Sequence, residues 1–157
     1  MIKIIELLDI VYIAGFLDGD GSIIAQLVKR DDYKWSYQIR VTVQFTQLKK
    51  RRIFLEKLKD IIGPGYVRDR KDVSDYVITD VKSVYALLQK LQPYLRIKQK
   101  QADLTLRLID QLPASKKSKD KFIELSQLID QIASLNDTKK NRVITSVTVI
   151  NTLTDLK

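Results

Sequence analysis

Apolar positions along the first half of the chain change twice between a helical period and strict alternation. Between residues 4 and 17 they recur at helical intervals, which predicts a helix. Residues 22–30 and 35–46 alternate instead, as two strands of a hairpin do. In the second of these strands the outward positions are Gln38, Arg40, Thr42, Gln44 and Thr46. The helical period returns at 47–62 and ends at a Gly-Pro-Gly sequence.

The second half repeats this order and then becomes helical. Short alternating segments predict strands at 66–70 and 75–79, followed by helices at 81–91, 96–112, 120–135 and 143–156, with a break from Pro113 to Ser118. The order helix, two strands, helix, two strands, helix indicates an α+β fold in which helices cover one face of an antiparallel sheet. We expect a single domain over 1–157, with a core at about 5–112 and C-terminal helices at about 113–157.

The end of the first predicted helix carries candidate chemistry. Gly15 and Gly19 share one helix face, and because glycine costs about 1 kcal/mol in a helix interior, close approach of a second backbone is the plausible reason for both. Asp18 and Asp20 lie where the helix dipole disfavours carboxylates, so a divalent cation held by oxygen ligands would offset that penalty. The alternative is an ordinary turn with Gly21 as the helix cap.

Composition narrows the classes of function. The chain of 157 residues has no Cys and no His, which excludes disulfides, thiolate chemistry, His-based triads and nearly all zinc sites. Its net charge of +9 indicates a polyanionic partner, nucleic acid first and an anionic membrane surface second. No apolar segment approaches the roughly 18 residues of a membrane span, and the first residues show no signal or transit pattern.

The uncovered face of the predicted sheet is rich in glutamine and arginine. These side chains form the standard major-groove pairings with adenine and guanine, so the face is suited to contacting base edges. An ordinary polar outer face is the alternative. The positions concerned are Gln26, Arg30, Gln38, Arg40, Thr42, Gln44, Arg68 and Arg70.

The segment Ile13–Gly21, IAGFLDGDG, resembles the signature motif of the LAGLIDADG homing endonucleases, with Phe16 and Gly19 as mild departures. The order of elements resembles the single-motif branch of that family over residues 5 to 155. The resemblance implies an αββαββα core with a saddle-shaped sheet on DNA. It also implies a homodimer that pairs the two motif helices through Tyr12, Gly15, Asp18 and Gly19.

The resemblance further implies an endonuclease that cuts a long, partly palindromic DNA target, one phosphodiester per strand, leaving short 3′ overhangs. Asp20 and the Gly19 carbonyl would bind Mg²⁺, with Mn²⁺ able to substitute and Ca²⁺ able to bind without supporting cleavage. Gln47 would order water, and Arg51 and Lys98 would stabilise phosphate charge. Asp18 lies about 200° around the helix from Asp20, so we expect it to be structural.

Residues implied to contact DNA come from all four strands and the hairpin turn. They are Ile24, Gln26, Val28, Arg30, Tyr33, Gln38, Arg40, Thr42, Gln44, Tyr66, Arg68, Arg70, Asp75 and Val77. The alternative is an RNA-binding intron maturase or a DNA-binding protein that does not cut. A platform of exposed aromatic residues would favour single-stranded RNA, and on this face only Tyr66 is clear. An organellar location, in chloroplast or mitochondrion, is suggested by the resemblance alone.

Overall fold

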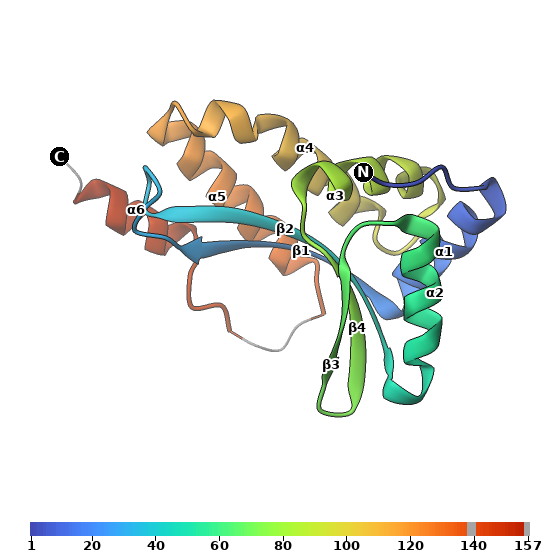
Figure 1. Cartoon of the computed structure of the whole chain (residues 1–157). Coiled ribbons are helices and arrows are strands. Elements are labelled where there is room, and N and C mark those ends of the chain that lie inside the picture. The colour runs from blue at the N-terminus through green and yellow to red at the C-terminus, as the bar shows by residue number, and fades with distance from the viewer. Residues whose placement is uncertain (138–140, 156–157) are drawn as a thin grey trace.

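The computed structural model describes residues 1–137 and 141–155, and this part of the chain forms the α+β fold expected from the sequence (Figure 1). The α-helices are α1 (Leu7–Asp20), α2 (Arg52–Ile62), α3 (Val81–Leu91), α4 (Gln99–Ser115), α5 (Lys119–Ser134) and α6 (Ser146–Thr154). The strands are β1 (Gly21–Lys29), β2 (Tyr37–Leu48), β3 (Tyr66–Arg70) and β4 (Val73–Ile78). Two 3₁₀ turns, η1 (Lys49–Arg51) and η2 (Gln92–Tyr94), join them.

The four strands form one antiparallel sheet in the order β1-β2-β4-β3. Directly opposed residues in such a sheet point to the same face. The register places Gln26 opposite Arg40 and Arg68 opposite Asp75. The outward positions that the alternation predicted therefore lie side by side on one surface, here called the open sheet face.

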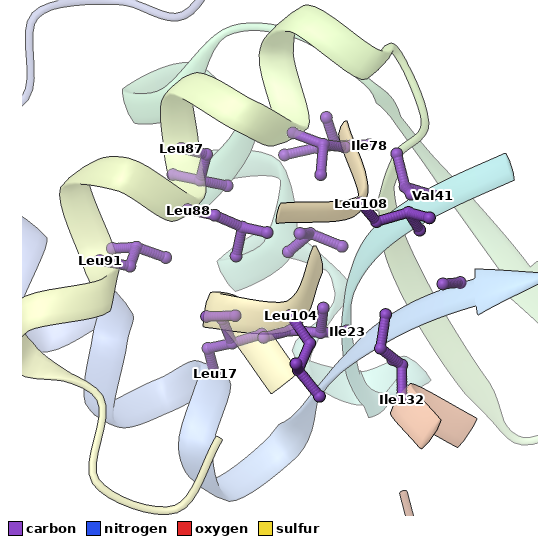
Figure 2. Close-up of a cluster of buried hydrophobic side chains, with 14 of the residues drawn as sticks. Leu17, Ile23, Val41, Ile78, Leu87, Leu88, Leu91, Leu104, Leu108 and Ile132 are labelled. Atoms are coloured by element: carbon purple, nitrogen blue, oxygen red, sulfur yellow. The ribbon is translucent and has the colours of Figure 1, made fainter. Parts of the chain in front are cut away.

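Helices cover the opposite face and enclose the core. Figure 1 shows α3 and α4 above the long β1–β2 hairpin and α2 beside the β3–β4 hairpin, while α1 and α5 pack against strand β1. Figure 2 shows how Leu17 of α1, Ile23 of β1 and Leu104 of α4 converge with leucines of α3. Burying each such side chain contributes about 1.5–3 kcal/mol, so this cluster fixes the sheet against its helices.

Helix α1 is apolar on both sides, and only one side meets the core. Ile13, Ala14 and Leu17 are buried, whereas Leu8 and Tyr12 on the other side are 84% and 59% exposed. An apolar helix surface left open to water is typical of a contact with another molecule.

Several element boundaries differ from the sequence predictions. Gln47 belongs to β2, not to the following helix, because pairing with β4 continues through Leu48 opposite Val73. Helix α4 begins at Gln99 and continues past Pro113 to Ser115. A proline so close to the end costs one backbone hydrogen bond and leaves the preceding turns intact. The last helix is confined to Ser146–Thr154, and its predicted end at residue 156 lies outside the described residues.

Over the ranges 1–137 and 141–155, no helix is both long enough and apolar enough to cross a lipid bilayer.

Candidate active site and open sheet face

Helix α1 passes directly into strand β1, with Asp20 as the last helical residue and Gly21 as the first strand residue. A Cβ atom at Gly21 would lie 2.5 Å from Leu17 Cδ1 and 3.0 Å from the Gln44 carbonyl oxygen. Only glycine fits this junction without displacing its neighbours. Gly21 caps the helix through its N–H to the Leu17 carbonyl, in extended conformation, with φ of −114°. The junction leaves the Asp20 side chain exposed at the helix end.

Three of the predicted catalytic residues form one hydrogen-bonded chain. Gln47 Nε2 donates to Asp20 Oδ2 at 2.7 Å, and Arg51 Nε donates to Gln47 Oε1 at 2.5 Å. Gln47 comes from the end of β2 and Arg51 from the turn η1 that follows it. The end of β2 therefore brings an amide and a guanidinium group to the carboxylate at the end of α1.

The fourth residue, Lys98, reaches the same helix end from a distant part of the sequence. Its Nζ donates to the backbone carbonyl of Asp18 at 2.7 Å. The Asp18 carboxylate accepts hydrogen bonds from the backbone N–H groups of Arg96, Ile97 and Lys98 at 2.8, 3.2 and 2.9 Å. Asp18 thus holds the segment before α4. The sequence argument gave Asp18 a structural role but had no signal for these partners.

The donor atoms at this helix end suit a hard divalent cation. The Asp20 carboxylate and the Gly19 carbonyl supply oxygen, the donor that Mg²⁺ and Ca²⁺ prefer. Among the described residues no three His, Cys, Asp or Glu side chains gather as a metal-binding group. One copy of the chain therefore offers part of a coordination shell, which water, phosphate or a second copy would complete.

On the open sheet face, Asp75 lies beneath the two arginines of β3. Its side chain is fully buried, Arg68 Nε lies 3.4 Å from Asp75 Oδ2, and Arg70 Nη2 donates to Oδ1 at 3.0 Å. Thr46 Oγ1 donates to the same carboxylate at 2.7 Å. Burial alone would raise the pKa of Asp75, but the hydrogen bonds from Arg70 and Thr46 and the Arg70 charge hold that pKa below its usual value.

This burial corrects part of the predicted DNA-contact set. Asp75, Val77 and Thr42 are only 0%, 3% and 6% exposed, so their side chains do not present a surface to a ligand. The alternation along a strand identifies the face on which a residue lies and not its depth. At Asp75 the side chains of Arg68 and Arg70, which bind its carboxylate, are the accessible groups.

The remaining predicted contact residues are at least partly accessible, and several are held by neighbours. Arg30 binds Asp32 through both Nε and Nη2, each at 3.0 Å, and its guanidinium lies 5.1 Å from the Tyr33 ring centre. Arg40 donates to Gln38 at 3.4 Å. Besides these four, the accessible set comprises Ile24, Gln26, Val28, Gln44, Tyr66, Arg68 and Arg70.

Three of the four predicted interface residues, Tyr12, Gly15 and Gly19, are exposed on α1, whereas the carboxylate of the fourth, Asp18, binds the backbone of residues 96–98. A Cβ atom added at Gly15 or at Gly19 would meet nothing within 4 Å, so neither glycine is required by packing inside this chain. A hollow of about 420 Å³ beside them is lined by Val11, Gly15 and Asp18 and by residues 93–96. Two further apolar side chains outside α1 are exposed, those of Ile53 and Ile97, at 65% and 71%.

The fold, the motif at the α1–β1 junction and the open sheet face define a class of protein. Residues 13–109 match the sequence profile of the LAGLIDADG endonucleases. The chain belongs to the LAGLIDADG endonuclease family.

Two algal proteins are similar over most of their length. The chain is 54% identical to DNA endonuclease I-CreI of Chlamydomonas reinhardtii over 140 residues, which cover 89% of this chain and 85% of that protein. It is 38% identical to DNA endonuclease I-CvuI of Chlorella vulgaris over 134 residues, covering 85% and 83%.

Solved structures agree with this assignment. I-CvuI bound to its DNA target in the presence of Ca superposes with a TM-score of 0.89 at 36% identity, covering 94% of both chains. I-CvuI bound to the I-CreI target with Mg, in which the DNA is not cleaved, gives 0.88, covering 94% and 93%. The archaeal intron-encoded homing endonuclease I-Vdi141I, in complex with DNA, has the same fold at 18% identity, with a TM-score of 0.82.

Proposed function

We propose that this protein is a site-specific double-strand DNA endonuclease that acts as a homodimer on a long, partly palindromic target. The observation that carries the proposal is the convergence of Asp20, Gln47, Arg51 and Lys98 at one end of α1. A protein that only binds nucleic acid has no need of this set. Strand β1 of the open sheet face begins at Gly21, directly after Asp20. Contact with the bases and cleavage of the DNA backbone therefore belong to one surface.

The residues at the helix end have distinct roles in this reaction. Asp20 and the Gly19 carbonyl would hold Mg²⁺, which would supply Lewis-acid chemistry and activate a water as the nucleophile. Gln47 shares its amide between Asp20 and Arg51 and is placed to orient water. Arg51 and Lys98 stabilise the charge that develops on the phosphate. Mn²⁺ is expected to replace Mg²⁺, and Ca²⁺ is expected to bind without supporting cleavage.

Pairing of two copies along the uncovered side of α1 completes the site. Gly15 and Gly19 allow the two helix backbones to approach closely, as small residues do at tight helix contacts. A two-fold axis between the helices brings the two Asp20 carboxylates together. Two carboxylates so close together would repel each other, and bound divalent cations would offset the repulsion. The same symmetry explains a target whose two halves are related.

Direct base contacts come from the accessible part of the open sheet face. Arg68 and Arg70 present guanidinium groups suited to guanine, and Gln26, Gln38 and Gln44 present amides suited to adenine. An organellar gene inside an intron is the setting that the family alone suggests, and the two similar algal proteins are consistent with it.

The test is a selection for cleavage. The purified protein is incubated with Mg²⁺ and a long randomised duplex library, and the cut ends are sequenced, with EDTA and Asp20→Asn as controls. The expected result is a long, partly palindromic sequence recovered only with metal and Asp20. Asp20→Asn should abolish cutting and retain DNA binding.

Two outcomes would contradict the proposal. Cleavage by Asp20→Asn at the wild-type rate would remove Asp20 from the active site. Bound sequences without any cutting by the wild-type protein would refute the endonuclease activity, and intron RNA would then be the substrate to test for a splicing role.

A further inference from the structure

The contacts of Asp18 go beyond those of an ordinary helix-end residue. Three successive backbone N–H groups, from Arg96 to Lys98, donate to its carboxylate. Lys98 is the N-cap residue of α4, so these groups belong to the positive end of that helix. Converging N–H groups at a helix start form a favourable environment for an anion. The α4 terminus thus compensates the unfavourable position of Asp18 near the negative end of α1.

The Asp18 backbone makes a second contact with the same segment. Because the chain enters β1 at Gly21, the Asp18 carbonyl lies among the last carbonyls of α1, which lack partners within a helix. Lys98 Nζ donates to it at 2.7 Å. One residue therefore holds both the backbone and the side chain of Lys98. Asp18 is only two residues before Asp20, so its contacts with Lys98 lie next to the proposed metal-binding residue.

We propose that Asp18 is a positioning residue for the cleavage reaction, holding the Lys98 ammonium group at the scissile phosphate through the 96–98 backbone. This inference rests on the proposed endonuclease function. Because three backbone N–H groups already bind the Asp18 carboxylate, its effect passes through Lys98. The contact spans 80 residues of sequence and joins the motif helix to the start of α4.

The test is a double-mutant cycle on the target recovered by the selection. Single-turnover cleavage with Mg²⁺ is measured for the wild type, Asp18→Asn, Lys98→Ala and the double variant, with binding measured in Ca²⁺. Asp18→Asn should cut about 10-fold to 100-fold more slowly, the cost of misplacing one catalytic group, while its binding changes less than threefold. The double variant should be no slower than Lys98→Ala alone, because Asp18 then has no group left to position.

Asp103→Asn is the matched control. Asp103 accepts a hydrogen bond from Gln92 Nε2 at 2.7 Å, so this change also removes a carboxylate that tethers the η2–α4 segment, without touching Lys98. It should cut at nearly the wild-type rate. If Asp18→Asn does not fold, the cycle is run with Asp18→Glu, which keeps the charge and displaces the carboxylate by one methylene.

Several results would overturn the proposal. The Asp18 variant could cleave at the wild-type rate, or the rate losses of the two single variants could multiply in the double variant. Asp103→Asn could lose as much activity as Asp18→Asn. The Asp18 variant could also be a monomer where the wild type is a dimer. Each leaves the endonuclease function intact. A wild-type protein that never cuts refutes that function first and the role of Asp18 with it, so the two failures are distinguishable.

Discussion

Asp75 shows how a buried side chain can govern an exposed surface. It contacts Arg68, Arg70 and Thr46 from below, and the two arginines are half exposed above it. Arginines held in this way lose little side-chain freedom when they meet a base, so less of the binding free energy is spent on ordering them. The carboxylate therefore affects base recognition without reaching the DNA.

We predict that Asp75→Asn weakens base discrimination more than overall affinity. A neutral amide holds the two guanidinium groups less firmly, so part of the about 1–3 kcal/mol that a bidentate base contact contributes to discrimination should be lost. The measurement is competition binding between the selected target and its single-base variants. Asp69→Asn is the control, because Asp69 lies in β3 between the two arginines and binds Arg52 instead. An unchanged base preference in Asp75→Asn would contradict the prediction.

Residue roles on the open sheet face were only partly predictable. Alternation placed Asp75 on the correct face, because side chains of a strand alternate whatever their partners. Its depth depends on the pairing of β3 with β4, which puts Arg68 directly opposite. Pairing register is a tertiary property, so the sequence alone suggested a contact residue where the structure has a supporting one.

At the scale of elements, α1 contributes to the core, to the active site and to an uncovered apolar surface. Its buried side packs through Leu17, and Phe16 stacks on Phe45 at a ring-centre distance of 5.6 Å. The other side has open space at both glycines. Substitutions on that side should therefore change assembly while the fold of each copy persists.

Gly19→Leu is expected to block dimer formation. A leucine side chain fits within one copy, since nothing lies within 4 Å of the added Cβ, but it would occupy the space needed by a second helix backbone. Light scattering should report a dimer for the wild type and a folded monomer for Gly19→Leu. Gln89→Leu, on the exposed side of α3, adds the same side chain elsewhere and should remain dimeric. A dimeric Gly19→Leu protein would refute this interface.

Element types were predictable because their periods are long and regular, whereas several boundaries were not. The structure confirms β3 and α3 at the predicted residues. The predicted end of β2 at residue 46 was wrong, because Gln47 and Leu48 also pair with residues of β4. The hydrogen bonds of the candidate site were not predictable. The role of Lys98 at the phosphate stays a prediction, and nothing in the local sequence indicates that Asp18 contacts Lys98.

At the scale of the whole molecule, charge has a simple pH profile. Without histidine, no side chain has an ordinary pKa between 5 and 8. Hydrogen bonds from Ser83 lower the pKa of Asp80, and those from Ser74 and Arg52 lower the pKa of Asp69. Asp75 shifts in the same direction. These carboxylates are therefore ionised in the folded protein throughout the physiological range.

We predict a free energy of unfolding that is constant between about pH 5 and pH 8 and falls below about pH 4. A carboxylate whose pKa is lower in the folded state stabilises the fold fully above its unfolded value of about 3.9, and that contribution is lost as pH falls toward the folded value. Urea unfolding at pH 7, 5 and 3 measures it. A loss of stability between pH 7 and pH 5 would contradict the prediction.

The direct passage from α1 to β1 fixes the distance between the end of the helix and the bases that β1 would contact. No loop lies between α1, which ends at Asp20, and β1, which begins at Gly21. The strand therefore cannot shift along DNA independently of the helix end. A strand advances about 3.3 Å per residue, close to the 3.4 Å rise of one base pair, and its outward side chains recur at every second residue. If Asp20 acts at the cut phosphate as proposed, each outward position of β1 would lie a set number of base pairs from that phosphate. Inserting one residue at this junction should change the number of base pairs between the cut and the bases that β1 contacts. The preference for those bases should change less.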